Sequence, residues 1–300
     1  MARFRTAIIA CALSLALNAC ADREAADLVE RLKTRDAEEL HEVTGKIIRL
    51  PNSVAVPALL QGLQSEKWRT RYMSAQLLGK FQAPEAIPAL IVTLGDSIGG
   101  VQAKAAEALG KLAAQQATTR LIDLLDNDNE IVQIAAANAL GGIATPAGLP
   151  SLCRLAATRR LQLRTAAISA LGPCLDDTAA PVLSRQARAI ITAALHDTLA
   201  RVRIAGIVAL RGADYEGAID ALLGLVTDPS AEVQHVAVQA LGEITDTRHA
   251  AWHGDSHPDM GRITSVLDSV VAGSTNVAVV ARAREALARI AAAGKINDRI

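Results

Sequence analysis

The sequence predicts an all-α fold, an α-solenoid of about eight antiparallel helical pairs, and three observations carry this prediction. A short motif recurs with a spacing of 31 residues, and each copy contains two apolar stripes at helical intervals. The regular copies close at Gly79, Gly110, Gly141 and Gly172, and further copies close at Arg211, Gly242 and Ala288. The chain is 51% apolar but only 2% aromatic, which favours closely packed helices with small side chains over a β-sandwich or barrel.

Positive and negative side chains are equal in number over the whole chain. Lys and Arg together number 31, as do Asp and Glu, so the formal net charge is zero. Nothing in this balance attracts the chain to nucleic acid, and we expect no nucleic-acid partner. Its 300 residues would suffice for two globular domains, but a solenoid grows as one continuous body.

The N-terminus, residues 1–19, has the pattern of a lipoprotein signal peptide. Arg3 and Arg5 are followed by the apolar run Ala7–Leu17, which is too short to span a bilayer. Leu17-Asn18-Ala19-Cys20 resembles the bacterial lipobox, and the resemblance implies that Cys20 is the acylated first mature residue. An ordinary signal peptide that ends near a cysteine is the alternative.

The resemblance also implies a location in the cell. In lipoproteins of this kind an aspartate directly after the acylated cysteine favours the inner membrane, and this chain has Ala21 there. We therefore expect a protein of the bacterial cell envelope, lipid-anchored and facing the periplasm, with the outer membrane favoured over the inner.

Residues 20–50 are expected to form the anchor and an N-terminal capping repeat. Leu28, Val29 and Leu32 make one helical stripe, and a turn at Thr34–Asp36 precedes a second stripe. Terminal repeats are usually atypical because one of their faces meets water.

Residues 51–292 are expected to form the regular solenoid, with a C-terminal tail at 293–300. Pro57, Pro88 and Pro150 are each predicted to begin a first helix. The predicted caps of the second helices are Asp96, Asp126, Asp128, Asp197 and Asp228. Only small residues stand five places before the closing position, which suggests that adjacent repeats approach closely there: Ser74, Ala105, Ala136, Ala167, Gly206 and Ala237. The closing glycines fit left-handed helix ends.

Two insertions interrupt the period. Eight extra residues fall near 173–184 and fifteen near 245–261, because two intervals measure 39 and 46 residues instead of 31. Both are predicted to emerge as loops.

The pattern Pro-x-Leu, an Asp-bearing turn, Val-(Arg/Gln) and Ala-x-Ala-Leu-Gly resembles the HEAT repeat, in the short form first associated with phycobilin lyases. The resemblance implies a binding scaffold that presents its second helices to a partner. HEAT-like hydroxylases with a di-iron centre carry several His-Glu dyads, and only His41-Glu42 occurs here. Nucleophile-elbow, phosphate-loop, dinucleotide and zinc-protease motifs are also absent, so we expect no enzyme.

A polar column stands eight places before the closing position: Arg71, Gln102, Gln133, Arg164, Arg203 and Gln234. One interpretation is a ladder that binds a ligand. The interpretation that we favour is that the column bonds to the turn aspartates of its own or neighbouring repeats.

Trp68, Arg69, Arg71 and Tyr72 place two aromatic rings and two arginines within one helical turn of an aromatic-poor chain. These are the residue types that dominate protein interfaces, so we predict a partner-binding patch. The alternative is that Trp68 closes the core beneath the N-terminal cap.

Cys153 and Cys174 are the cysteines that remain after Cys11 and Cys20. Their places in the repeat put them about 13 Å apart along the helix axis, beyond the reach of a disulfide. Both are interpreted as small core residues.

The second insertion contains His249, His253, Asp255 and His257, which offer imidazole and carboxylate ligands for zinc or copper. Asp259 follows nearby. The alternative is a solvated loop whose histidines are incidental.

The function that we expect is a lipid-anchored periplasmic protein-binding scaffold or assembly factor. The alternative is a metal-binding or enzymatic accessory protein that uses the His/Asp-rich loop 245–261. The expected partners are another protein and, through Cys20, the membrane. No cofactor is expected, apart from a transition metal ion in the alternative.

Overall fold

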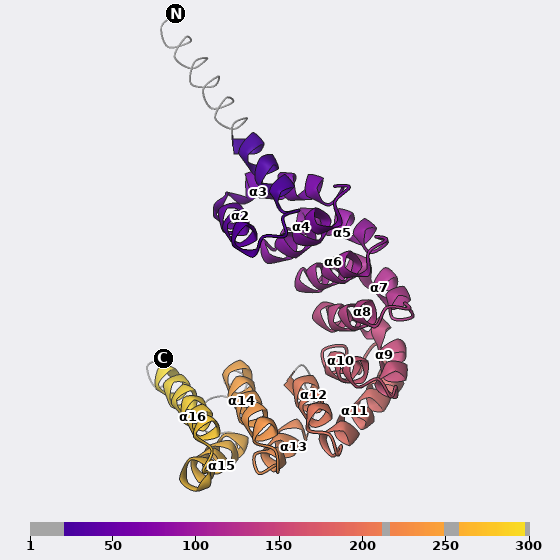
Figure 1. The fold of residues 1–300 in the computed structure, drawn as a ribbon. Helices are drawn as coiled ribbons and strands as arrows, with labels where there is room; N and C mark the ends of the chain where they lie inside the picture. The colour runs from indigo at the N-terminus through magenta and orange to yellow at the C-terminus, as the bar shows by residue number, and fades with distance from the viewer. Residues whose placement is uncertain (1–20, 212–216, 249–257, 298–300) are drawn as a thin grey trace, which may run out of the picture. The chain divides into compact units, whose positions relative to one another are not determined.

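The computed structural model describes residues 21–211, 217–248 and 258–297, and within these ranges every regular element is helical (Figure 1). Contacts divide the chain into an N-terminal unit, residues 1–143, and a C-terminal unit, residues 144–300. None of the helices in the described ranges combines the length and the apolar character needed to cross a membrane.

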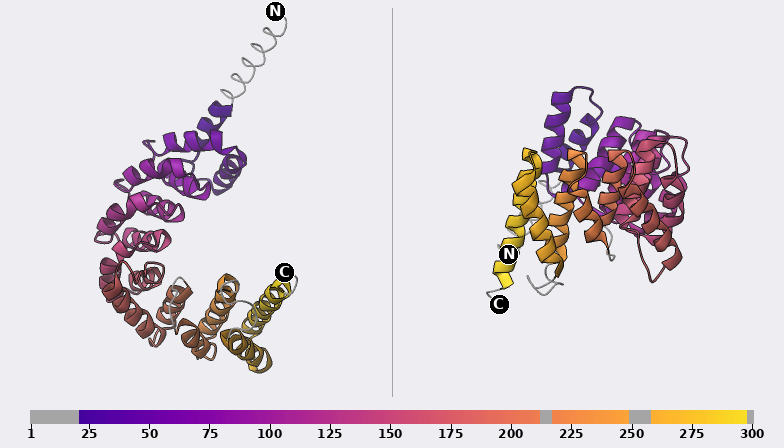
Figure 2. Two further views of the ribbon diagram at one scale, coloured as in Figure 1. Left: turned by 180° about the vertical axis from the view of Figure 1, so that it is seen from behind. Right: turned by 90° about the horizontal axis from the view of Figure 1, so that it is seen from below.

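The N-terminal unit consists of helical pairs. It contains a helix over residues 21–31, then α2 (Ala37–Arg49), α3 (Asn52–Gly62), α4 (Trp68–Lys80), α5 (Ile87–Thr93), α6 (Gly99–Lys111), α7 (Thr118–Leu124) and α8 (Glu130–Ile143). Short 3₁₀ turns precede α5 and α7. Each short first helix packs on the second helix that follows it, and α4, α6 and α8 lie side by side in one layer (Figures 1 and 2).

The C-terminal unit repeats this arrangement. It contains α9 (Leu149–Ala156), α10 (Leu161–Leu171), α11 (Pro181–Leu195), α12 (Ala200–Arg211), α13 (Ala218–Leu225), α14 (Ala231–Arg248), α15 (Pro258–Gly273) and α16 (Val277–Asn297). Here α12 packs on both α10 and α14, and α14 packs on α16. The two units together confirm the predicted all-α solenoid of helical pairs.

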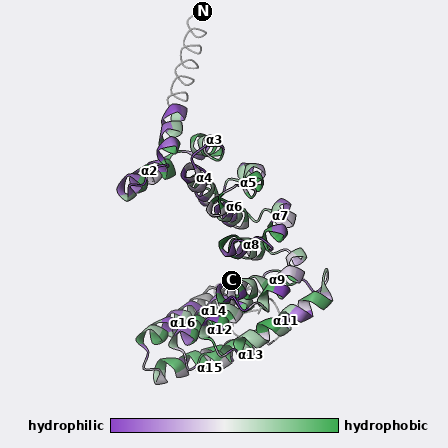
Figure 3. Ribbon diagram, turned by 45° about the vertical axis from the view of Figure 1, so that its right-hand side comes forward, coloured by the Kyte–Doolittle hydropathy of each residue, from purple (hydrophilic) through white to green (hydrophobic). Residues whose placement is uncertain are grey.

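The core is aliphatic, as the composition predicts. Leu59, Leu90 and Leu121 occupy the same place in successive first helices, and each side chain is fully buried. Burying one leucine stabilises the folded protein by about 1.5–3 kcal/mol, so this position contributes to the stability of each repeat. Apolar and polar residues are interleaved along single helices, so that each helix has a buried and a solvated side (Figure 3).

The two helices expected before residue 50 are present, over residues 21–31 and in α2. Asp36 precedes α2, and its carboxylate accepts hydrogen bonds from the backbone N–H groups of Glu38 and Glu39. Val43 and Ile47 on the second stripe are fully buried. The second helix of the N-terminal repeat therefore begins with a standard side-chain cap, and its apolar stripe packs into the core.

The closing glycines do not end helices in a left-handed conformation, so that prediction is wrong. The non-glycine residues with positive φ are Gln82, Ala113 and Ala144 in the described ranges, each three places after a closing glycine. Gly110 instead lies where two second helices cross, because a Cβ added to it would be 2.8 Å from the Cα of Ala139. The contact recurs between Gly79 and Ala108, Gly172 and Ala209, and Gly242 and Ala286.

The small residues five places before the closing position serve a different contact from the one predicted. A Cβ on Gly62 of α3 would lie 2.2 Å from the hydroxyl oxygen of Ser74, and one on Gly206 would lie 2.8 Å from Leu195 of α11. Both contacts are within one helical pair. Small side chains at this column therefore let a second helix approach its own first helix, not the adjacent repeat.

Two of the three predicted first-helix starts are confirmed. Pro88 and Pro150 stand in the first turns of α5 and α9, where a missing N–H costs nothing. Pro57 lies inside α3, because that helix begins five residues earlier at Asn52. The apolar residues Val54 and Val56 before this proline continue the stripe and lengthen the helix.

In the first insertion residues 173–180 lie outside helices, as predicted, and residues 181–184 belong to α11; in the second, residues 249–257 lie outside the described ranges. The first insertion includes the start of α11, which has 15 residues against 7 in α5. In the second, α14 continues to Arg248 and α15 begins at Pro258. At the C-terminal end, α16 continues through Asn297, beyond the predicted boundary at Ala292.

Candidate functional site

Every turn between a first and a second helix contains one polar residue that bonds to the backbone. Its side-chain oxygen accepts a hydrogen bond from the N–H two residues later, at 2.8–3.4 Å. These turn residues are Ser65, Asp96, Asn127, Thr158, Asp197, Asp228 and Ser274. A short side chain with an oxygen acceptor thus fixes the same turn in each repeat.

Arg71 of the polar column joins two consecutive turns. Its Nη1 donates to the carbonyl oxygens of Ser65 and Glu66 in its own repeat, at 2.8 and 3.1 Å. Its Nε and Nη2 donate to the two carboxylate oxygens of Asp96 in the next repeat, at 2.6 and 2.9 Å. This bidentate geometry is the strongest form of the Arg–carboxylate pair.

The same arrangement recurs in the C-terminal unit. Arg203 donates to the carbonyl oxygens of Asp197 and Thr198, and forms a bidentate pair with Asp228 at 2.8 and 2.7 Å. Arg164 donates to Asp197 across the longer first insertion, at 2.6 Å. The ion pair between a column arginine and the next turn aspartate is therefore retained where the spacing of the repeat changes.

Glutamine fills the column where the next turn lacks an aspartate. Gln102 donates to the carbonyl oxygen of Asp96 in its own turn, and Asn127 of the next turn lies 3.4 Å from its amide oxygen. Gln133 and Gln234 donate in the same way to Leu125 and Asp228, at 2.8 and 2.7 Å. Column and turn residues are thus matched in charge: Arg precedes a turn with Asp, and Gln precedes a turn with neutral Asn, Thr or Ser.

The turn aspartates are held ionised. Burial alone would raise the pKa of Asp96, but hydrogen bonds from Arg71 and from the N–H of Ile98 outweigh it and hold that pKa below its usual value. Arg203 and the N–H of Ser230 lower the pKa of Asp228 against burial in the same way. A ligand approaching this column would have to displace these internal bonds.

The prediction that the column positions the turns is confirmed by this geometry, and the ligand-ladder alternative is not supported. The predicted capping role of the aspartates is corrected in one respect. Asp96 bonds to the N–H of Ile98, which itself precedes α6, so it stabilises the turn before the helix. In the third turn Asn127 has this role, not Asp126 or Asp128.

An exposed aromatic cluster lies at the start of α4. The Trp68 side chain is 44% exposed, and the Arg69 guanidinium stands 5.0 Å from its ring centroid. Tyr72 meets Trp68 edge to face at 6.4 Å, and the Lys104 ammonium of α6 lies 5.6 Å from the Tyr72 ring. The exposure of Trp68 is too high for a residue that closes the core.

The structure thus brings three of the four predicted patch residues together, Trp68, Arg69 and Tyr72. Arg71 belongs to the turn bonds and has a side chain only 16% exposed. Lys104 is the residue that the sequence analysis missed, since it lies 32 places from Tyr72 in the sequence. Only the packing of α4 on α6 brings them together.

Two further exposed apolar residues stand at equivalent helix starts in the N-terminal unit. Ile98 directly precedes α6 and is 39% exposed, and Ile131 near the start of α8 is 64% exposed. The helices α4, α6 and α8 lie side by side, and Trp68, Ile98 and Ile131 each stand within two residues of the start of one of them. We call these three residues and Tyr72 the apolar edge.

Cys153 and Cys174 are both buried and do not form a disulfide with each other, as expected for core residues. Burial raises the pKa of the Cys174 thiol to about 12. Neither position has the partly exposed, electropositive surroundings that make a cysteine reactive.

The remaining predicted sites lie outside the residues that the structure describes. These are Cys20 and the cluster His249, His253, Asp255 and His257. Over the described ranges, three or more potential ligands from His, Cys, Asp and Glu do not gather at any point. Lipidation at Cys20 and metal binding by the cluster therefore stay predictions.

Family comparison decides the repeat class. The model of HEAT repeats matches overlapping segments of this chain, over residues 25–99, 56–137, 93–172, 118–189 and 187–252. The chain belongs to the HEAT-repeat family. No curated protein matches it significantly.

One solved structure supports this HEAT fold. The complex of CpcE and CpcF of phycocyanin lyase from Nostoc sp. PCC7120 matches with a TM-score of 0.52 and 22% identity, over 81% of this chain and 95% of that one. Human deoxyhypusine hydroxylase in complex with glycerol matches with a TM-score of 0.37 and 19% identity, over 91% of this chain and 98% of that one. At 22% identity the similarity to the CpcE–CpcF complex shows the fold alone.

Proposed function

We propose that this HEAT-repeat chain is a lipid-anchored scaffold that binds a partner protein in the bacterial periplasm. The observation that carries the binding role is the apolar edge. Trp68, Ile98 and Ile131 are exposed apolar side chains at the starts of three neighbouring helices, and exposed apolar groups that gather on one surface mark interaction sites. Trp68 and Tyr72 are also the residue types that contribute most to protein interfaces.

The charged residues around this edge support the same role. Arg69 and Lys104 each stand over an aromatic ring, and Lys104 also pairs with Glu107 at 2.7 Å. Interfaces commonly combine an apolar centre with a charged rim that sets orientation. A protein surface of complementary shape, with apolar groups at its centre and polar groups around them, fits this arrangement.

The CpcE–CpcF structure supports binding by repeats of this fold, since it is described as a complex. For this chain a catalytic role is not part of the proposal. The largely buried Arg–Asp pairs are already used to join repeats.

A matched pair of exposed apolar residues tests the binding role. Ile131 lies on the apolar edge, whereas Val92 on the first helix α5 is 79% exposed and lies elsewhere. We expect Ile131→Asp to abolish recovery of a specific partner from detergent-solubilised envelopes, while Val92→Asp retains it. The partner identified in this way is then purified, and its affinity for each variant is measured. Equal affinity for both variants would reject the edge as the binding surface.

The anchor is supported by the lipobox pattern around Cys20, and it is tested separately. Cys20→Ser is expected to abolish incorporation of labelled palmitate and to release the protein from the membrane fraction, because the thiol is the attachment point. Continued labelling of the variant would reject the anchor without bearing on the apolar edge.

A further inference from the structure

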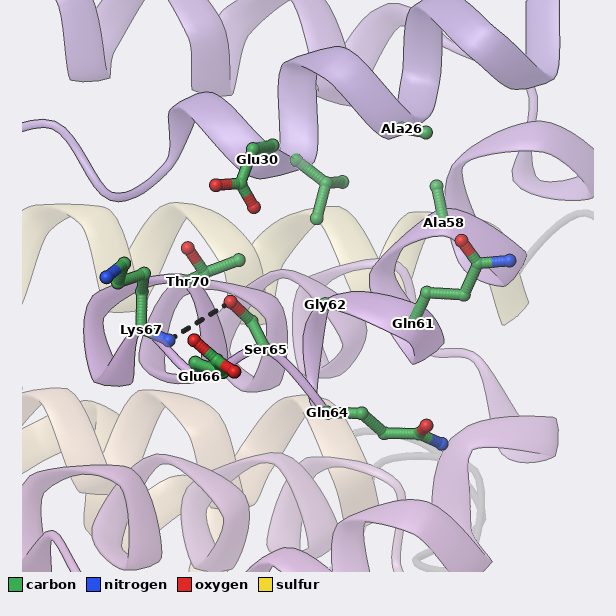
Figure 4. A pocket seen from close by; sticks show the side chains of 11 residues that line it. Ala26, Glu30, Ala58, Gln61, Gly62, Gln64, Ser65, Glu66, Lys67 and Thr70 are labelled. Carbon is green, nitrogen blue, oxygen red and sulfur yellow. Dashed lines mark hydrogen bonds between the residues drawn. The ribbon is translucent and has the colours of Figure 1, made fainter.

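A pocket of about 380 Å³ lies in the N-terminal unit, beside the start of α4 (Figure 4). One wall is the helix over residues 21–31, which contributes Glu30. The other walls are the end of α3, at Gly62, and the turn that leads into α4. The volume falls within the range of sites for small molecules.

The floor of this pocket contains a buried hydroxyl without a hydrogen-bond partner among the described residues. Thr70 in the first turn of α4 is only 1% exposed, and its Oγ1 has no such partner. Figure 4 shows the hydroxyl directed into the space below Glu30. Buried polar groups in folded proteins are almost always bonded, so this one is available to a group bound in the pocket.

The start of α4 adds further donors at the same place. The first N–H groups of a helix have no acceptor within it, and Lys67, which precedes α4, supplies no side-chain cap. Lys67 is also one of the residues that line the pocket. A helix start, a free hydroxyl and a cation together suit a carboxylate.

The rim has the opposite charge. Glu30 and Glu66 both line the pocket, and Glu30 pairs with Lys33 at 2.6 Å outside it. A purely anionic ligand would meet these two carboxylates, and a purely cationic one would meet the helix start and Lys67. A molecule with both charges satisfies both sets of groups.

We propose that this pocket binds a small zwitterion with the chemistry of a free α-amino acid. Its carboxylate accepts hydrogen bonds from the Thr70 hydroxyl and from the start of α4. Its ammonium group lies at the rim, beside Glu66 and Glu30. The site is independent of the partner-binding role proposed above.

The test is calorimetric titration of the purified full-length protein at neutral pH. The probes are glycine, L-alanine, L-serine, L-glutamine and L-glutamate, with acetate and ethylammonium as single-charge controls. We expect at least one amino acid to bind with a dissociation constant of about 1 mM or tighter, and both controls to bind at least about tenfold more weakly. Absence of binding by every amino acid, or equally tight binding of acetate, would overturn the proposal.

Two hydroxyls on one helix face provide a matched control. Ser74 is also fully buried and without a partner, but it lies against Gly62 and does not line the pocket. Thr70→Val is expected to weaken binding about tenfold without lowering the melting temperature, since it removes an unbonded hydroxyl. Ser74→Ala should leave binding unchanged. Equal effects of the two variants on amino-acid binding would contradict the assignment of the Thr70 hydroxyl to the site. If Thr70→Val does not fold, Glu66→Gln, at an exposed rim position, tests the ammonium site instead.

Discussion

Arg71 on α4 and Asp96 in the following turn are 25 residues apart in the sequence, and their side chains form a bidentate ion pair that joins two repeats. Arg203 and Asp228 have the same separation and the same geometry. In the neighbouring repeat this pair of positions is occupied by Gln102 and Asn127, which lie within 3.4 Å. The chain therefore contains a charged and a neutral version of one contact.

A double-mutant cycle tests this relationship. Arg71→Gln and Asp96→Asn are each expected to lower the free energy of unfolding by about 1–3 kcal/mol, because each leaves a largely buried charge unpaired. The double variant reproduces the neutral pair and should lose less than the sum of the two, with a coupling of about 1 kcal/mol or more. Urea denaturation of the four proteins measures this coupling, and strictly additive losses would show that the pair does not interact.

The ion pairs also predict how stability depends on pH. The pKa values of Asp96, Asp197 and Asp228 are all lowered in the folded protein, so their stabilisation is complete above the ordinary value of 3.8. It is lost as the pH falls below that value and through the folded pKa values. Urea denaturation at pH 7, 5 and 3 should show a loss of stability between pH 5 and 3 that is smaller in the Arg71→Gln, Asp96→Asn variant. An equal loss of stability in both proteins would show that groups other than this ion pair cause the acid sensitivity.

Helix crossing at the closing glycines gives a third prediction. Gly110→Ala places a methyl group 2.8 Å from the Cα of Ala139 and should destabilise the protein by about 1–3 kcal/mol. Gly45→Ala in α2 meets nothing within 4 Å and should stabilise it by about 0.5–1 kcal/mol through helix propensity. Thermal unfolding of the two variants decides between a crossing role and a role at a helix end. A neutral Gly110→Ala would remove the crossing interpretation.

The repeat could be predicted from the sequence because every copy packs its helices with the same residue types at the same positions. Leu59, Leu90 and Leu121 show this most simply, since all three recur at 31-residue spacing and all are buried. The polar column was also predictable in outline. Arg beside Asp, and Gln beside Asn, suggests internal pairing even before the partner atoms are known.

The role of the closing glycines could not be deduced from the sequence. A glycine near the end of a helix fits a left-handed terminus and a close crossing equally well. Only the position of Ala139 on the next helix distinguishes them at Gly110. Pro181 illustrates a related difficulty, because the extra residues of an insertion can extend a helix as readily as they can form a loop.

The apolar edge was only partly predictable. Trp68 and Tyr72 stand out in an aromatic-poor chain, but Ile98 and Ile131 lie at helix starts, outside the apolar stripes that define the period. An isolated isoleucine at a turn gives no indication in the sequence that it belongs to a surface. They become a surface only when α6 and α8 pack beside α4.

The binding role at the apolar edge is the central claim, and a triple variant at the start of α4 tests it most directly. Trp68→Ala, Arg69→Ala, Tyr72→Ala removes the exposed cluster and retains Arg71, which the turns require. The measurement is the dissociation constant for the purified partner, by calorimetry, with circular dichroism as the check on folding. We predict an affinity loss of about 100-fold or more, equivalent to at least about 2.7 kcal/mol, in a variant that keeps its helical content. Unchanged affinity in that folded variant would contradict the account.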